Sequence, residues 1–125
     1  MTIYVGTNVK VVDKTGAKSV LIINLFKNRK KVEVGQTIKS VCKKAILKTT
    51  SGKKLAQKSK MYNVVLVRQK KALLKPSGNG IFFKTKGVVL LNKENESLSY
   101  RIEGPISLEL RHNYLKTLSY SNYLI

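Results

Sequence analysis

Three short apolar runs between residues 64 and 92 set the strongest limit on the possible folds of this chain. The runs are Val64–Val67, Ile81–Phe83 and Val88–Leu91, and each is rich in β-branched or aromatic side chains. Apolar runs of strand length with turn residues between them are typical of antiparallel β-structure. The basic residues inserted between the runs cannot be buried without partners. We therefore expect these cations at strand ends and in loops, facing a partner.

The same stretch resembles the signature of a known family. That signature has a small residue, three aliphatic residues, then Asp, Asn or Ser followed by Gly, and finally an aromatic residue and a Val-aliphatic pair. The family is the L14 family, that of the universal ribosomal large-subunit protein uL14. Val64 stands where the family has Gly or Ala, and Lys86 stands where it has Asn or Thr. The residues that match in register are Val65, Leu66, Val67, Ser77, Gly78, Phe83, Val89 and Leu90.

Two further segments resemble elements of that family. Residues 11–18, VVDKTGAK, are similar to its V-x-D-N-S-G-A-K/R element, with Lys14 and Thr15 in place of Asn and Ser. Residues 100–111, YRIEGPISLELR, are similar to its T-R-I-x-G-P-[VI]-x-x-E-L-R element, with Tyr100 in place of Thr. The link between the helices that follow is one residue shorter than in the family. The three matches keep the family's order along most of the chain.

The charge of the chain indicates a polyanionic partner. Its 125 residues include 25 Lys and Arg against six Asp and Glu, so the formal net charge is +19. Such self-repulsion is tolerable where a polyanion neutralises it, whereas an ordinary solvated surface has both signs interspersed. The length fits one domain. We expect its barrel core at about residues 1–104 and a C-terminal helical part at about residues 105–125.

The first half of the chain predicts further strands. Asn8–Asp13 is expected to form a strand and Ala17–Phe26 the returning one. The carboxylate of Asp13 is expected to stabilise the turn between them through backbone N–H groups. Thr37–Leu47 is expected to be a strand that either contains a bulge or crosses from the core to the surface. Cys42 is expected to fill a core position in it.

The second half predicts two strands, a hairpin and a helical end. Met61–Arg68 is expected to be a strand, and Ser77–Gly80 a hairpin turn in which Gly residues permit positive φ. Beyond Gly104 the apolar period changes from two towards 3.6. This change predicts short helices, with Pro105 in the first turn of one. Ser119–Ile125 is expected to pack as a tail on the barrel.

No pattern in the sequence supports catalysis or a cofactor. There is no close pair of carboxylates in an apolar setting, and no HExxH, nucleophile elbow or CxxC. The single cysteine, Cys42, excludes an internal disulfide and cannot make a metal site alone. His112 is remote from it in sequence. We expect a protein that is not an enzyme and needs no metal or cofactor.

The cations are expected to bind RNA phosphates, because each neutralised phosphate releases condensed counterions. Lys27–Lys31 is expected to form a basic hairpin tip, and Lys48–Lys60 a protruding loop or two-stranded ribbon. Arginine side chains can bind phosphate bidentately, while lysines act as point charges. The residues expected to contact rRNA are Lys18, Arg29, Lys30, Lys31, Lys43, Lys44, Lys48, Lys53, Lys54, Arg68, Lys70, Lys71, Lys75, Lys84 and Arg111.

The resemblance to the L14 family implies more than composition does. It implies a mainly β fold, a small five-stranded β-barrel with a protruding ribbon and a short C-terminal helical part. It implies direct binding to large-subunit rRNA and a contribution to intersubunit bridges with small-subunit rRNA. The implied protein neighbours are uL3-like and bL19-like ribosomal proteins. A ribosome silencing factor would bind the C-terminal face, where Arg101 and, across the shortened link, Lys116 are the matching positions.

Two other functions and the compartment stay open at this point. A free single-strand-binding barrel that regulates translation would share the basic loops, and would bind unstructured oligonucleotides without preference for folded rRNA. A cationic membrane-surface protein would need a longer basic amphipathic helix than residues 106–118 provide. Abundant Lys, Asn, Ile and Leu, and an N-terminus without a presequence, indicate a mitochondrial ribosome. A bacterial cytoplasm or a plastid is the alternative.

Overall fold

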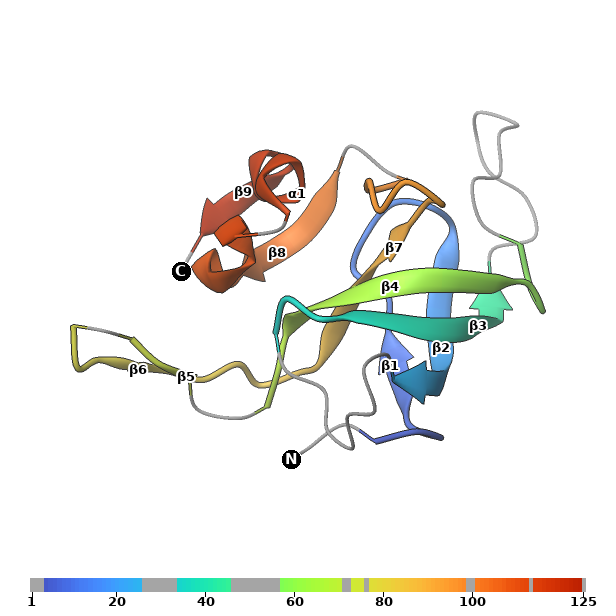
Figure 1. Ribbon diagram of the computed structural model, residues 1–125, viewed down its shortest axis with the longest axis horizontal. Helices are drawn as coiled ribbons and strands as arrows, with labels where there is room; N and C mark the ends of the chain where they lie inside the picture. The colour runs from blue at the N-terminus through green and yellow to red at the C-terminus, as the bar shows by residue number, and fades with distance from the viewer. Residues whose placement is uncertain are drawn as a thin grey trace.

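The chain folds mainly into β-structure, as a computed structural model shows for residues 4–25, 34–45, 57–70, 73–75, 77–98, 101–112 and 114–124. Its main sheet has five antiparallel strands in the order β1-β2-β3-β4-β7 (Figure 1). This confirms the expectation of a mainly β fold. The strands are β1 Asn8–Lys10, β2 Ala17–Leu25, β3 Thr37–Ala45, β4 Met61–Arg68 and β7 Gly87–Leu91.

The two edges of this sheet approach each other without closing a continuous ladder. Val11, just after β1, forms an isolated parallel bridge with Val88 on β7. The N–H of Val12 donates to the carbonyl of Val88 at 3.0 Å. Because β1 has three residues, the chain leaves the edge before a longer pairing with β7 can form. In contrast to the expectation, the sheet is therefore not closed into a barrel.

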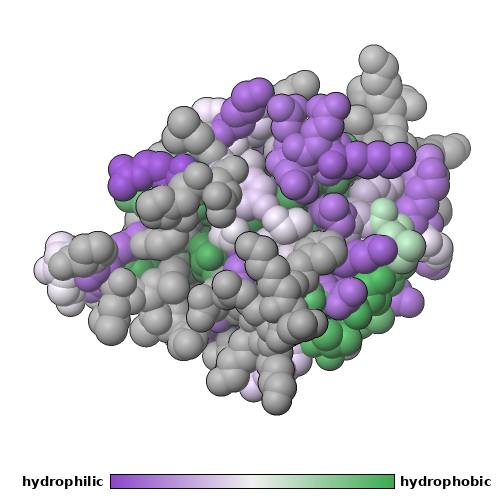
Figure 2. Space-filling model, in the orientation of Figure 1, coloured by the Kyte–Doolittle hydropathy of each residue, from purple (hydrophilic) through white to green (hydrophobic). Residues whose placement is uncertain are grey.

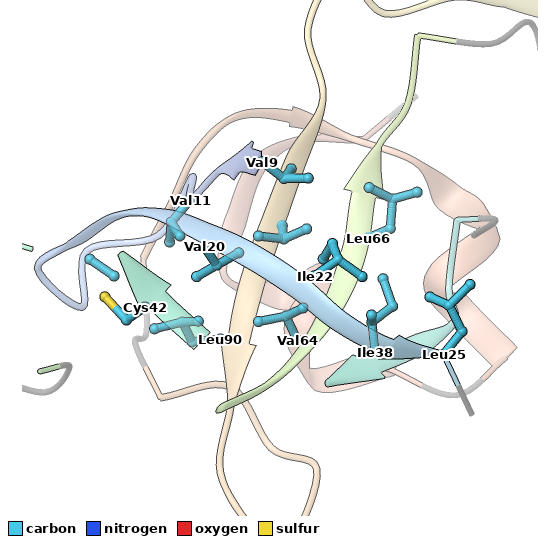
Figure 3. Packing of buried hydrophobic residues seen from close by; sticks show 12 residues of the cluster. Val9, Val11, Val20, Ile22, Leu25, Ile38, Cys42, Val64, Leu66 and Leu90 are labelled. Carbon is cyan, nitrogen blue, oxygen red and sulfur yellow. The ribbon is translucent and has the colours of Figure 1, made fainter. Parts of the chain in front are cut away.

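The inner face of the curved sheet holds one apolar core (Figure 3). Alternate residues of each strand point inward, as the period of two along a strand requires. Cys42 is fully buried among them, which confirms its predicted place in the core. The register between β2 and β3 shifts three times, so the predicted bulge is also confirmed. The core includes Val9, Val20, Ile22, Ile38, Cys42, Val64, Leu66, Val88 and Leu90.

The outer face of β4 and β7 is covered as well, by the C-terminal part of the chain. Val65, Val67, Val89 and Leu91 pack there in a second apolar cluster. Their partners from the C-terminal part include Ile102, Ile106, Leu110, Tyr114 and Leu118. Burial on both faces explains why Val64–Val67 and Val88–Leu91 are continuous apolar runs rather than alternating ones.

The C-terminal part contains less helix than the sequence predicts. Strand β8, Ile102–Ile106, pairs in parallel with β9, Ser121–Leu124, and Pro105 lies within β8 opposite Tyr123. Pro105 is therefore not in the first turn of a helix, and that prediction is wrong. Among the described residues of this part, the helical ones belong to the 3₁₀ helix η2, Leu108–His112, and to α1, Leu115–Ser119. The apolar period could not reveal this pairing, because the two strands lie far apart in sequence.

A small hairpin projects from the sheet between β4 and β7 (Figure 1). It consists of β5, Leu73–Leu74, paired with β6, Gly80–Ile81. Gly78 takes a φ of +90°, and its N–H donates to the carbonyl of Lys75 at 2.9 Å. The predicted turn at residues 77–80 is therefore confirmed.

Two predicted basic segments fall largely outside the described residues. They are the hairpin tip at residues 27–31 and, in the expected loop or ribbon, residues 48–56. Gln57–Lys60, the end of that second segment, forms a turn that leads into β4. No helix in the described parts of the chain is long and apolar enough to cross a membrane.

Candidate nucleic-acid interface

Asp13 fixes the turn between β1 and β2 to strand β7. Its Oδ1 accepts hydrogen bonds from the hydroxyl of Thr15 at 2.6 Å and from the N–H of Thr15 at 3.3 Å. Its Oδ2 accepts a hydrogen bond from the N–H of Leu90 at 2.9 Å. Burial raises the pKa of Asp13, and these hydrogen bonds partly offset the effect. The predicted role of Asp13 in the turn is confirmed, and the link to Leu90 adds a second role that the sequence did not show.

Five exposed lysines gather at the end of the sheet that this turn defines. Lys10 on β1 lies opposite Ser19 on β2, and Ser19 lies opposite Lys44 on β3. The carbonyl of Lys60, just before β4, accepts a hydrogen bond from the N–H of Cys42 on β3. Pairing across four adjacent segments therefore brings together cations that are distant in sequence. We call Lys10, Lys18, Lys43, Lys44 and Lys60 the cationic edge.

The cationic edge includes three of the residues predicted to contact rRNA and two lysines that the sequence analysis did not single out. Lys18, Lys43 and Lys44 were expected from the sequence, whereas Lys10 and Lys60 were not. The signal for Lys10 is its place in the alternation of β1, where Val9 is buried and both its neighbours are exposed. Hydrophilic side chains also gather over the upper and right-hand parts of the face in Figure 2.

Arg68 differs from the other predicted cations because it is half-buried inside the fold. It lies at the end of β4 opposite Gly87 on β7. Its Nη2 donates to the carbonyl of Glu103 on β8 at 3.2 Å, and its Nε is buried with no hydrogen-bond partner within the described residues. Desolvation lowers the pKa of Arg68, which nevertheless stays charged. The arginine therefore links the main sheet to the C-terminal part, and a phosphate contact by it stays a prediction.

Two glycines make room for the guanidinium of Arg68. A Cβ on Gly104 would lie 2.9 Å from its Nη1, and a Cβ on Gly87 would lie 3.0 Å from its Nε. Gly104 also has a φ of +76°, which L side chains rarely adopt. Close backbone approach at two points is what holds this long side chain in one place.

The other described site residues lie on different elements. Lys70 and Lys84 are exposed and Lys75 is half-buried, near the two ends of the β5–β6 hairpin. Arg111 is exposed on η2, and Arg101 is exposed just before β8. The structure thus distributes these cations over several loops and the helix η2, away from the cationic edge. Arg29, Lys30, Lys31, Lys48, Lys53, Lys54 and Lys71 lie outside the described residues.

Several described carboxylates are already engaged within the protein. Glu103 pairs with Lys14, and this hydrogen-bonded pair lowers the pKa of Glu103. Glu96 pairs with Lys116 on α1 at 3.2 Å. Within the described residues, no group of three or more His, Cys, Asp or Glu could hold a metal ion. A mainly β fold with lysines exposed at its strand ends and few opposing acids belongs to the class of basic proteins that bind polyanions.

Comparison with known proteins identifies the family within this class. Residues 2–125 match the family described as ribosomal protein L14p/L23e. Over 103 residues the chain is 40% identical to the large ribosomal subunit protein uL14 of Hydrogenobaculum sp., an alignment that covers 82% of this chain and 81% of that protein. The chain belongs to the ribosomal protein L14 family. It is a structural, non-enzymatic component of the large ribosomal subunit, and a free regulatory barrel is not favoured.

Proposed function

We propose that the protein acts as a single L14-type domain that binds large-subunit rRNA directly through exposed cations. The observation that carries this proposal is the cationic edge, where pairing of neighbouring segments assembles five exposed lysines. Each phosphate that such a lysine neutralises releases condensed counterions, which favours binding. Recognition would follow the shape of folded RNA, because lysines act as point charges and read no base edges.

The remaining predicted cations extend this proposal to further RNA contacts. Lys70 and Lys84 flank the β5–β6 hairpin, Lys75 lies between its two strands, and Arg111 lies on the C-terminal part. Loops on different sides of the fold suit a protein held between RNA segments. We accordingly propose contacts to small-subunit rRNA at intersubunit bridges. Neighbouring uL3-like and bL19-like ribosomal proteins belong to the same proposal.

We also propose that a ribosome silencing factor binds near Arg101 and Lys116. Both residues are exposed in the structure. The ammonium group of Lys116 is paired with Glu96, so a partner would have to compete with that carboxylate. Exposed pairs of this kind contribute about 0–1 kcal/mol, so such competition is feasible.

We propose the mitochondrial ribosome as the place of action, with a bacterial cytoplasm or a plastid as the alternative. The support is the abundance of Lys, Asn, Ile and Leu together with the departures from the family motifs. The similarity to the protein of Hydrogenobaculum sp. supports the bacterial alternative. Immunodetection in fractionated cells of the source organism, with mitochondrial and cytosolic ribosomes separated, tests this proposal.

The RNA-binding proposal is tested by the salt dependence of binding to a large-subunit rRNA transcript. Lys44→Ala on the cationic edge should weaken binding and reduce the magnitude of the slope of log K against log salt by about 0.7–0.9. The matched control is Lys14→Ala, which removes the same charge from a lysine already paired with Glu103. Equal slopes for both variants would contradict the role of the cationic edge. Failure of the unmodified protein to sediment with large subunits through moderate salt would contradict RNA binding itself.

A further inference from the structure

A mostly apolar hollow lies on the sheet outside the cationic edge, and its floor crosses three strands. Lys39 on β3 lies opposite Asn63 on β4, and Asn63 lies opposite Leu91 on β7. The hollow has a volume of about 340 Å³. Small-molecule pockets in proteins start at about this size. We call it the Met61 hollow, after the methionine at its side.

Two side chains of the Met61 hollow offer contact surfaces for a flat apolar group. Met61 is 59% exposed, so its thioether is accessible to a ligand. Tyr62 is half-buried, and its hydroxyl oxygen accepts a hydrogen bond from the N–H of Gln57 at 2.9 Å. The aromatic ring is therefore held in place before any ligand arrives. Leu91 and Leu98 complete the apolar lining.

Two amide side chains add hydrogen-bonding groups to this apolar lining. The Oδ1 of Asn92 accepts hydrogen bonds from the N–H groups of Glu94 and Glu96 at 2.9 and 3.0 Å, which makes residues 92–96 a compact turn. The amide nitrogen of Asn92 keeps its donor capacity. Asn63 provides one further amide, with both a donor and an acceptor group. Such groups match the edges of a nucleobase.

The two cations of the hollow are suited to the phosphates on either side of that base. Lys39 lies on β3, whereas Lys93 lies in the turn after β7, so the two approach the hollow from different elements. Glu96 in the same turn is already paired with Lys116. With a net charge of +19, the protein as a whole attracts polyanions.

We propose that the Met61 hollow binds an unstacked nucleobase of a single-stranded RNA loop, with Lys39 and Lys93 on the flanking phosphates. The proposal rests on the RNA-binding function proposed above and adds a contact of a different kind. Sequence-tolerant stacking on aromatic and apolar side chains is how unpaired bases are held in many RNA-binding proteins. The cationic edge would supply affinity, whereas the hollow would supply a preference for looped over fully paired RNA.

The test compares two RNA probes of equal charge, a hairpin with a short oligoadenosine loop and a blunt duplex. The full chain and its Met61→Ala variant are measured with both probes by fluorescence anisotropy. Loss of the apolar contact that Met61 makes with the base should weaken binding to the hairpin about tenfold and leave binding to the duplex unchanged. The salt slope should not change, since no charge is removed. Asn63→Ala should also lower the preference for the hairpin over the duplex, as Met61→Ala does.

The control for phosphate contact is Lys44→Ala, which should weaken binding to both probes alike and reduce the salt slope. A hairpin with abasic residues in its loop should bind the unmodified protein and Met61→Ala equally. Met61 is exposed, so its truncation should leave the urea midpoint unchanged.

Three results would overturn the inference. One is an unchanged hairpin-to-duplex ratio in Met61→Ala. Another is a lowered urea midpoint without loss of that ratio, which would indicate that a segment of this chain fills the hollow. The third is a larger effect of Met61→Ala on binding of an oligoglutamate peptide than on the hairpin, which would assign the hollow to an acidic protein. Absence of binding to either RNA by the unmodified protein would instead contradict the proposed function itself.

Discussion

Replacing Asp13 with alanine tests whether one carboxylate holds the turn of residues 13–16 against strand β7. The variant removes the acceptor for two backbone N–H groups, those of Thr15 and Leu90, and for the hydroxyl of Thr15. The hydroxyl can rotate to another acceptor, whereas the backbone groups cannot. Thr15 is 1% exposed and Leu90 is fully buried, so water cannot readily replace the lost oxygen atoms.

The expected loss of stability follows from the two backbone N–H groups that would have no acceptor. A buried donor without a partner costs about 1–3 kcal/mol. The variant also removes the cost of burying the carboxylate itself, which offsets part of the loss. We therefore expect Asp13→Ala to lower the free energy of unfolding by about 2–4 kcal/mol. With a urea m-value of about 2 kcal/mol/M, the midpoint should fall by about 1–2 M.

Urea unfolding followed by circular dichroism measures this shift. The control is Glu103→Gln, which weakens an ion pair whose two side chains are both more than half exposed. Such pairs contribute about 0–1 kcal/mol, so the control should unfold close to the unmodified protein. If Asp13→Ala lowered the midpoint no more than this control, the argument from buried donors would be refuted.

The pH dependence gives a second check on the same carboxylate. Because the pKa of Asp13 is raised by burial above its ordinary value of 3.8, the folded state binds this proton more tightly than the unfolded state does. The titration of Asp13 therefore favours folding most below pH 3.8, and this contribution is lost as the pH rises through the raised pKa. The difference in unfolding free energy between the unmodified protein and Asp13→Asn should fall over that range. A difference in unfolding free energy that rose with pH would contradict a raised pKa for Asp13.

Two further predictions concern the link to the C-terminal part and the core. Gly104→Ala should lower the free energy of unfolding by about 1–3 kcal/mol, because Gly104 has a positive φ and the new Cβ would displace the side chain of Arg68. Urea unfolding measures this loss. An unchanged urea midpoint would count against the role of Arg68 in linking the main sheet to the C-terminal part. Cys42 is fully buried, so its thiol should react with a thiol reagent only as fast as the protein unfolds or opens locally. Labelling as fast as that of a short cysteine peptide would contradict the position of Cys42 in the core.

Local residue patterns predicted the main strands well, because each strand carries its own signal. Met61–Arg68 was predicted with the observed bounds, and the turn at residues 77–80 follows from glycine at Gly78. The continuous apolar run Val64–Val67 showed that this strand is buried without showing what covers its outer face. The C-terminal part provides that cover through β8, η2 and α1.

The candidate site was predicted less completely than the strands. Basic residues were recognised from the net charge, but their grouping depends on strand register. Lys10 and Lys60 belong to the cationic edge because β1 and residue 60 lie beside β2 and β3. Arg68 was expected at a phosphate, whereas the structure shows its guanidinium bonded to the carbonyl of Glu103. The sequence alone does not show which cations make hydrogen bonds within the protein.

The amino-acid sequence alone determined the mainly β character, the positions of the main strands, the polyanionic partner and, through three motifs, the family. These properties depend on the period of apolar residues, on turn chemistry and on net charge, which are local or additive. The tertiary structure decided how far the sheet closes, that Pro105 lies in a strand paired with residues near Tyr123, and which lysines lie together. These depend on hydrogen bonds and packing between residues far apart in the chain, because backbone groups take partners wherever the fold brings them.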